Sequence, residues 1–362
     1  MEGRGNGWRV VRKMHSVGGI TATGPRDVWV KGDFKKETGK RFSVQRWNGD
    51  SWNEIGLPGN VITTGPIGSS SRDNVWITAD VWKPGTGRSP RDWQTVALRW
   101  DGKRFTCSIM GRYGVGELAV LGPRDVWAVG YPSDLRYRVK SHPRGPYFMH
   151  WNGERWRPAP TPTPKRLSYV SASSPTDVWA LRETSQWAGD GMTFWHWDGQ
   201  SWGRVRTPPI APPPGAGIGW GELYDLTALP SGDIWAAGKV GWWKPSDPEG
   251  EDAPHRQKSL LLHWDGHRWS SFLGPEGEEY WSIAPDGAGG VWMATDDGYY
   301  VHHTRDGAVT RVQSASYHMQ PQNYQASMDH LINVPGTTSM LAATMTDDAP
   351  KGLVPVLEGY GM

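Results

Sequence analysis

The chain has 362 residues, with 39 Lys and Arg against 37 Asp and Glu, and its net charge at pH 7 is +2. This balance argues against nucleic acid as a partner, because binding a polyanion requires a basic surface. No apolar run approaches the roughly 18 residues that a transmembrane helix needs, and the single Cys107 cannot form an internal disulfide.

In chain order, one phrase built around a Trp recurs. It reads GPRDVWV at 24–30, SRDNVWI at 71–77, PRDVWAV at 123–129, PTDVWAL at 175–181, SGDIWAA at 231–237 and AGGVWMA at 288–294. An eroded seventh copy, TTSMLAAT, has Leu341 in the Trp place, and a second phrase such as QRWNGDSW or LHWDGHRW follows most copies. The anchors lie roughly fifty positions apart, so seven units fill the chain.

Each unit predicts an antiparallel sheet of four strands. Apolar runs of strand length alternate with Gly, Pro and Asp clusters, and no sustained helical period occurs. Asn-Gly or Asp-Gly between two short aromatic runs favours a tight hairpin, because these residues accept the positive φ of the turn. Seven such units predict an all-β, seven-bladed β-propeller, and we expect residues 1–362 to form a single domain.

The two ends of the chain predict how the ring closes. The last unit stops at VPVLEGYGM, which supplies a third strand but no Trp after its turn. Residues 5–11, GNGWRVV, have the pattern of a fourth strand with Trp8 in the missing place. We therefore expect the N-terminal strand to complete the seventh blade and to leave no open sheet edge.

The repeated phrases resemble the Trp-rich DVWAVG…HWDGxxW repeats of bacterial β-propellers, whose architecture is related to that of kelch and other galactose-oxidase-like propellers. The resemblance covers nearly the whole chain and implies the propeller fold. It implies little about activity, because such propellers serve in binding, in scaffolding and in catalysis.

Most of the 24 Trp residues occupy repeated positions, where wide rings are expected to fill the space between neighbouring blades. The unrepeated ones fall mainly in connections that share one face of the ring, which is where a rigid scaffold presents a binding site. With nearby Tyr and Arg residues they form the predicted ligand-binding set: Trp82, Arg91, Trp93, Tyr137, Arg138, Trp187, Trp220, Tyr224, Trp242, Trp243, Tyr280 and Trp281. The alternative is that long loops use Trp to build small cores of their own.

The polar residues divide in the same way. His150, His196 and His263 repeat once per blade, so they cannot converge on one metal ion and are expected to be scaffold. The Asp residues before the strand Trp are also expected to be scaffold and to bond backbone N–H groups of their own turns. Non-repeating groups at the channel mouth could act as general acid and base. They are Glu117, Glu279, Asp329 and His330. The alternative is that they only line a water-filled channel.

Three functions are compatible with the sequence. The first is a monomeric propeller that binds a small molecule, a glycan or a peptide in a mouth lined by Trp and Arg. The second is an enzyme without metal or cofactor that uses the channel-mouth carboxylates and His, as a hydrolase, lyase or cyclase. The third is a scaffold for another protein. No phosphate loop, zinc motif or nucleophile elbow occurs, and no membrane partner is expected. The N-terminus has no apolar core of a signal peptide, so we expect a cytoplasmic protein unless a leader has been removed.

Overall fold

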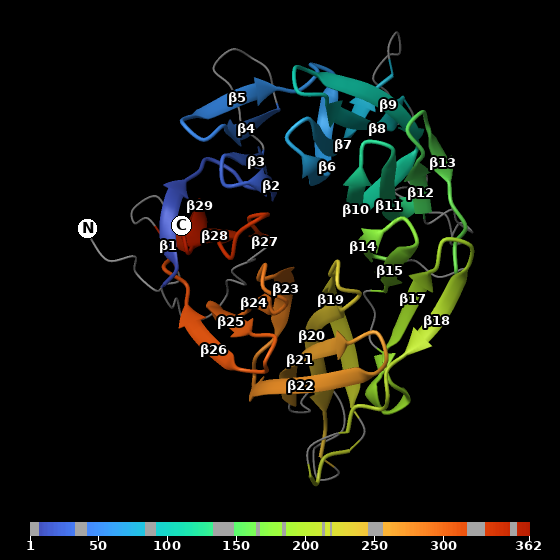
Figure 1. Ribbon diagram of the computed structural model, residues 1–362, viewed down its shortest axis with the longest axis vertical. Helices are drawn as coiled ribbons and strands as arrows, with labels where there is room; N and C mark the ends of the chain where they lie inside the picture. The colour runs from blue at the N-terminus through green and yellow to red at the C-terminus, as the bar shows by residue number, and fades with distance from the viewer. Residues whose placement is uncertain are drawn as a thin grey trace.

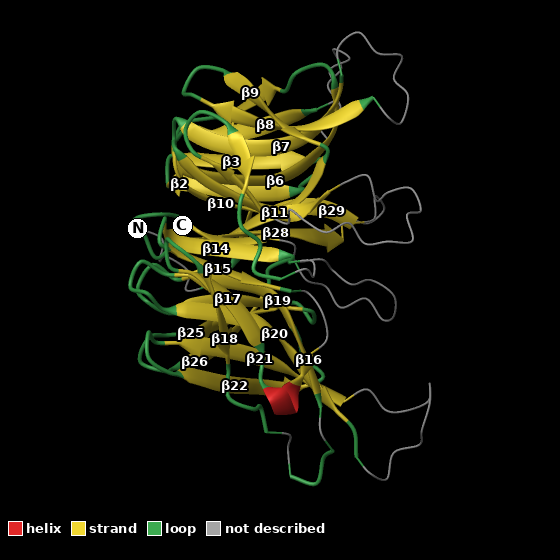
Figure 2. Ribbon diagram, turned by 90° about the vertical axis from the view of Figure 1, so that its right-hand side faces the viewer, coloured by secondary structure: helices red, strands yellow, loops and turns green. Residues whose placement is uncertain are grey.

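Seven antiparallel sheets surround a central channel in the computed structural model (Figure 1). The structure describes residues 7–32, 42–83, 92–132, 148–163, 167–182, 186–211, 214–217, 219–244, 256–316, 330–347 and 353–362. Figure 2 views the molecule from its edge and shows the strands running between the two faces of the disc. The predicted seven-bladed propeller is confirmed, with one sheet for each repeat.

Within each blade the strands follow one another from the channel outward. Blade one contains β2 (Gly19–Gly24), β3 (Asp27–Gly32), β4 (Ser43–Trp47) and β5 (Trp52–Gly56). Blade two contains β6 (Val61–Ser71), β7 (Asn74–Trp82), β8 (Trp93–Trp100) and β9 (Phe105–Gly111). Blade three contains β10 (Tyr113–Gly122), β11 (Asp125–Pro132), β12 (Phe148–Trp151) and β13 (Trp156–Pro158). Blade four contains β14 (Tyr169–Ser174), β15 (Asp177–Leu181), β17 (Thr193–Trp197) and β18 (Trp202–Arg206).

The remaining blades follow the same plan with two additions. Blade five contains β19 (Trp220–Ala228), β20 (Ile234–Trp242), β21 (Arg256–Trp264) and β22 (Trp269–Glu276), and the short β16 (Gln186–Trp187) pairs with β19. Blade six contains β23 (Tyr280–Pro285), β24 (Val291–Thr295), β25 (Tyr299–His303) and β26 (Val309–Gln313). Blade seven contains β27 (His330–Asn333), β28 (Met340–Asp347), β29 (Leu353–Tyr360) and β1 (Arg9–Lys13). Among the described residues, η2 (Ala188–Asp190) is a single 3-10 turn, and no helix has the length and apolarity to span a membrane.

The ring closes as the sequence predicts. Strand β1 pairs antiparallel with β29, with Arg9 opposite Gly359 and Lys13 opposite Val356. Trp8 is buried and stacks on Tyr300 of blade six with ring centroids 3.7 Å apart. The two ends of the chain therefore build one sheet, and Trp8 fills the place that the last repeat leaves without a Trp.

The repeated Trp residues join neighbouring blades. The anchors of blades one to six and Leu341 of blade seven are all buried. The rings of Trp29 in blade one and Trp100 in blade two have centroids 5.4 Å apart. In blade six the second phrase is eroded, and His303 stands where the other blades have a Trp. Its ring centroid lies 5.3 Å from that of Trp235 in blade five. Large flat rings thus fill the spaces between the twisted sheets, as expected.

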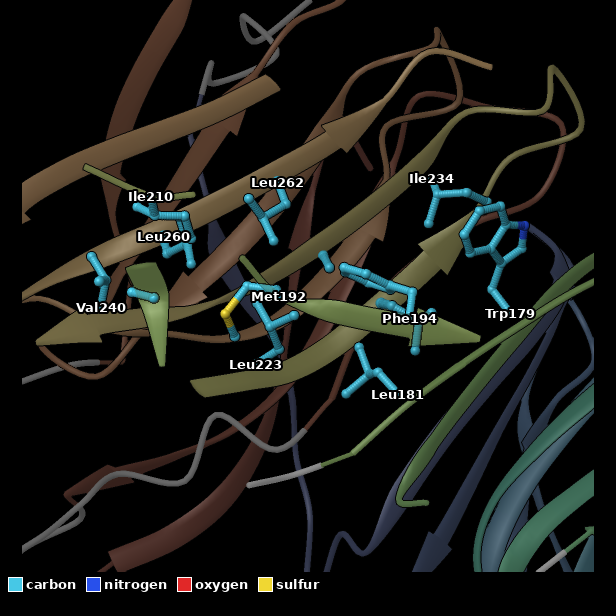
Figure 3. Close-up of a cluster of buried hydrophobic side chains, with 13 residues drawn as sticks. Trp179, Leu181, Met192, Phe194, Ile210, Leu223, Ile234, Val240, Leu260 and Leu262 are labelled. Atoms are coloured by element: carbon cyan, nitrogen blue, oxygen red, sulfur yellow. The ribbon is translucent and has the colours of Figure 1, made fainter. Parts of the chain in front are cut away.

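Buried apolar side chains gather at each boundary between blades. Figure 3 shows the cluster between blades four and five, where Trp179 and Phe194 lie beside Ile234 and Leu262. Met192 belongs to the same cluster and comes from the connection between β15 and β17. The core of this protein is therefore distributed around the ring, which holds the inner strands in place around the channel.

The repeated His residues are scaffold, as predicted. His196 Nε2 lies 2.8 Å from Asp177 Oδ1, and the imidazole stacks on Trp179 with centroids 4.4 Å apart. The indole N–H of Trp179 donates to the same carboxylate oxygen at 2.7 Å. Our expectation that these Asp residues bond backbone N–H groups of their own turns is therefore wrong for Asp177. Asp286 of blade six, which is not one of these repeated Asp residues, does accept the N–H groups of Ala288 and Gly290.

Candidate ligand-binding site in the central channel

At a corresponding level of the ring, three inner strands carry a β-bulge of one extra residue, and β6 has a wider irregularity between Thr64 and Ile67. The pairing register shifts between Val115 and Glu117 in β10, between Leu223 and Asp225 in β19, and between Tyr280 and Ser282 in β23. The extra residue of a bulge is unpaired, and a bulge redirects the side chains around it. In β19 and β23 the extra residues are Tyr224 and Trp281, and their rings stack with centroids 4.6 Å apart at an interplanar angle of 7°. The bulges of neighbouring blades thus build one flat aromatic platform.

The platform faces a cavity of about 660 Å³ in the channel. The inner strands of all seven blades contribute to its lining. Much of the wall is apolar, with Ile20, Ile67, Leu118, Ile283 and Leu331 among its residues. Its ionisable residues other than Tyr, within the described part of the chain, are Glu117, Asp225, Asp296 and His330. No Lys or Arg is among the described lining residues.

Glu117 and Asp225 occupy equivalent positions, one residue after a bulge, and each accepts a backbone hydrogen bond from the next blade. The N–H of Val170 donates to Glu117 Oε2 at 2.8 Å, and the N–H of Ile283 donates to Asp225 Oδ2 at 2.9 Å. Ser282 fills the same position in β23, where its hydroxyl accepts the N–H of Leu331 at 3.3 Å. These side chains therefore connect the inner strands of neighbouring blades in addition to lining the cavity.

The two carboxyl groups differ in their electrostatics. Burial, and then the charge of Asp225, raise the pKa of Glu117 well above its ordinary value. Burial also raises the pKa of Asp225, to about 6, against the hydrogen bonds that it accepts from Ile283, Leu226 and Ser282. Burial thus disfavours the charged form of both groups, and Asp225, with a pKa of about 6, is still mostly ionised at neutral pH.

His330 lies at the start of β27, on the wall formed by blade seven. Burial within the ring and the charge of Lys31 lower the pKa of His330 to about 4. The ammonium of Lys31 donates to the carbonyl of Gly65 at 2.8 Å. His330 is therefore neutral at neutral pH, and its partner in the predicted acid–base group, Asp329, lies outside the described residues.

Glu279 is part of an ion pair at the edge of the cavity. Lys239 Nζ lies 2.8 Å from Glu279 Oε1 and 3.9 Å from Glu222 Oε2. The same ammonium lies over the rings of Trp220 and Tyr224, at 5.4 Å and 5.7 Å from their centroids. Glu279 Oε2 is buried and has no hydrogen-bond partner among the described residues. The ion pair with Lys239 weakens the prediction that Glu279 is a free catalytic acid or base.

The predicted aromatic residues separate into three groups. Tyr224 and Trp281 line the cavity, and Trp220 lies at its edge over Lys239. Trp187 and Trp243 form an exposed pair on blade five, 45% and 40% exposed, with centroids 5.7 Å apart.

The other predicted aromatics lie away from the cavity. Trp82 and Trp93 are half-buried and face each other across the β7–β8 pair. Trp242 and Tyr280 are each only 5% exposed and are not among the residues that line the cavity. Arg91, Tyr137 and Arg138 lie outside the described residues.

Asp225 and Asp296 are site residues that the sequence patterns did not reveal. Asp225 follows Tyr224, and only the bulge brings both side chains to the cavity. Asp296 lies in the turn between β24 and β25, where its carboxylate accepts the N–H of Glu279 at 2.9 Å. Among the described residues, no group of three or more His, Cys, Asp or Glu side chains is placed to hold a metal ion.

Comparison with known proteins identifies the class of protein by its fold. No family model and no curated protein sequence matches the chain. Among solved structures, Ycf48 bound to a D1 peptide has a TM-score of 0.52 at 12% identity, covering 99% of this chain and 97% of that one. The polysaccharide lyase Uly1 has a TM-score of 0.52 at 11% identity, covering 99% and 93%. Raptor of Chaetomium thermophilum has a TM-score of 0.52 at 10% identity, covering 98% of this chain and 29% of that one.

These likenesses show the seven-bladed propeller fold and nothing finer, because all three identities are low. The fold implied by the resemblance to Trp-rich bacterial repeats is confirmed by the seven sheets. Membership of the Trp-rich repeat family is not shown, because no family model matches the chain. The chain is thus a seven-bladed β-propeller with a cavity in its channel, and its ligand has to be argued from the site.

Proposed function

We propose that this protein is a ligand-binding β-propeller whose channel holds a small or medium-sized ligand such as a glycan, a peptide or an aromatic metabolite. The cavity of about 660 Å³ is within the size range of small-molecule sites. Its apolar wall and its few polar groups also have the composition of such sites.

The aromatic platform carries this proposal. Trp281 is 37% exposed although it lies on an inner strand, and its parallel stack on Tyr224 fixes the plane of its ring. A large exposed aromatic ring costs free energy in water, and a ligand with a flat face would cover it. The packing of the blades does not require an exposed Trp281, since the repeated Trp residues that pack the blades are buried between them.

A cofactor-free hydrolase or lyase is the second candidate. The observation in its favour is that burial raises the pKa values of Glu117 and Asp225, because carboxyl groups with perturbed pKa values in a cavity are typical of general acid–base catalysis. Against it, both groups already accept backbone N–H groups that join the blades. Glu279, the other predicted acid, is paired with Lys239. Binding is therefore the better supported function.

The test compares Trp281→Ala with a matched control, Phe272→Ala, which removes an exposed ring from the outermost strand of blade five. Peptides, oligosaccharides and aromatic metabolites are screened by the shift they cause in the melting temperature. A peptide and a polysaccharide belong in the panel as the ligand classes named for Ycf48 and Uly1, although those likenesses show the fold alone.

We expect Trp281→Ala to keep the melting temperature of the free protein and to lose the ligand-dependent shift, and we expect Phe272→Ala to retain both. A ligand shift of full size in Trp281→Ala would contradict the proposal. Turnover of a panel member that depends on Asp225 would instead favour the enzyme.

A further inference from the structure

The charge of the cavity narrows the class of ligand. Three carboxyl groups, those of Glu117, Asp225 and Asp296, line it, and although burial disfavours their charged forms, the described lining contains no Lys or Arg to balance the charge that remains. The only basic lining residue among those described is His330, which is neutral at neutral pH because burial and Lys31 lower its pKa to about 4. The field inside the cavity therefore favours positive charge and disfavours an anion.

At the edge of the cavity, too, negative groups outnumber positive ones, although different residues are responsible. The single ammonium of Lys239 lies between two carboxylates, Glu279 at 2.8 Å and Glu222 at 3.9 Å. One cation cannot neutralise both groups. Glu279 Oε2 is buried without a hydrogen-bond donor among the described residues, which is a costly state that a cationic or hydrogen-donating ligand would relieve. Glu279 lies beside the platform, since its charge contributes to the raised pKa of Tyr224.

The platform itself also favours a cation. The negative face of an indole attracts an ammonium or guanidinium group, and the attraction grows when water is excluded. The protein already uses this contact within the cluster, where Lys239 Nζ lies over the rings of Trp220 and Tyr224. Trp281 stacks on Tyr224 through one face and is 37% exposed, so ring surface remains for a second cation.

We propose that the ligand of the channel is an organic cation whose charged group binds among Asp225, Asp296 and the face of Trp281, on the side of blades five and six. This inference rests on the proposed binding function and specifies its ligand class. An anionic ligand is not favoured on the side of blades one and seven either. The ammonium of Lys31 there donates to the carbonyl of Gly65, and Lys31 does not line the cavity.

The test uses three probes of nearly equal size and shape: benzylammonium, benzyl alcohol and benzoate. Their dissociation constants are measured at neutral pH by ligand-observed NMR with the full chain. Ligands this small are expected to bind in the roughly millimolar range. We expect benzylammonium to bind about tenfold more tightly than benzyl alcohol, in line with one cation–π contact and one charged hydrogen bond, and benzoate to bind most weakly.

Three variants locate the site. Asp296→Asn keeps a carbonyl oxygen for the N–H of Glu279 and removes the charge. Asp225→Asn keeps an acceptor for the N–H of Ile283, but its NH2 group replaces the oxygen that accepts the N–H of Leu226, so it removes the charge and one hydrogen bond. Each is expected to reduce the preference for benzylammonium over benzyl alcohol by a factor of about three or more. Asp50→Asn, an exposed acid in the turn between β4 and β5, is the control and is expected to change nothing. If Asp225→Asn does not fold, Asp296→Asn decides.

The outcomes separate this inference from the function on which it rests. Equal binding of all three probes, or tighter binding of benzoate, overturns the cation preference and leaves a ligand-binding channel. If both Asn variants keep the preference for benzylammonium over benzyl alcohol, the proposed location of the ligand's charged group is wrong. Absence of binding for every probe contradicts the binding function as well as the inference.

Discussion

At the scale of single residues, two adjacent Trp residues show how differently one residue type is used. Trp242 is 5% exposed and Trp243 is 40% exposed. Both were predicted to contact a ligand, because both stand in the unrepeated segment GWWKP. The alternation of the strand does not show which of the two is buried, because Trp242 is the last residue of β20 and Trp243 is the first residue after it.

We expect Trp242→Ala to lower the free energy of unfolding by roughly 3 to 5 kcal/mol, because it leaves a cavity where a large buried ring was. Trp243→Ala removes a half-exposed ring and is expected to cost about 1 kcal/mol or less. Urea unfolding of the two variants measures both values. Equal losses would show that burial does not separate these two residues.

Asp225 makes a prediction about pH. Burial raises its pKa to about 6 in the folded protein, against about 3.9 for an Asp in an unfolded chain. The groups that face it are Glu117 from β10, Ser282 and the N–H of Ile283 from β23, and the N–H of Leu226 on its own strand. The folded protein thus holds this proton more tightly than the unfolded chain, so the stabilising contribution is complete below about pH 4 and is lost as the pH rises through about 6.

Asp225→Asn removes that titration. We expect its melting temperature, relative to the natural protein, to improve as the pH is raised from about 4 to about 6 and then to stay constant. Circular dichroism melts across this range measure the difference between the two proteins, which cancels the titration of groups that do not interact with Asp225; Glu117, whose pKa depends on the charge of Asp225, is the exception. A difference that does not vary with pH would mean that Asp225 is not perturbed.

At the scale of strands, the sequence predicts the elements better than their register. Alternating apolar residues and Asn-Gly or Asp-Gly turns were sufficient to predict the blades, because these signals are local. A bulge shifts by one residue which side chains face the channel, and its position depends on contacts with the next blade. This is why the sequence predicted both Tyr280 and Trp281 at the site although only Trp281 lines the cavity, and why Asp225 was missed beside Tyr224.

The links between inner strands make a prediction of their own. Val170 is buried, and Glu117 accepts its N–H. Glu117→Leu leaves that N–H without a partner and is expected to cost about 1 to 3 kcal/mol. Glu117→Gln keeps an acceptor oxygen for the N–H of Val170, so its cost is expected to be small. Chemical denaturation of both variants is the measurement, and equal losses would show that the hydrogen bond does not matter.

At the scale of the whole molecule, closure of the ring depends on a few residues at one end of the chain. Strand β1 covers the edge of β29, and Trp8 packs against Tyr300 and Trp292. This feature was predictable because a ring of repeats has to be complete, so a missing strand at one end indicates its source at the other. The ligand preference of the channel has no comparable rule, since the residues that line it do not repeat.

Deletion of residues 1–13 is expected to lower the melting temperature and broaden the transition, because the edge of β29 and the ring of Tyr300 become exposed. A synthetic peptide of those residues, added to the truncated protein, is expected to restore part of the loss. Its Trp8→Ala version serves as the control and is expected to restore less. An unchanged melting temperature after the deletion would contradict this mode of closure.

The pairing of β1 with β29 also determines how the molecule would respond to force. The two strands are antiparallel, so Arg9, at the start of the first strand, lies opposite Gly359, near the end of the last. Tension applied to the two ends of the chain would therefore load the hydrogen bonds of this pair one after another, from Arg9 toward Lys13. Strands pulled in this geometry separate like a zipper, whereas strands pulled along their length must break all their hydrogen bonds together. The ring would open at this seam under a small load while every other blade was still folded.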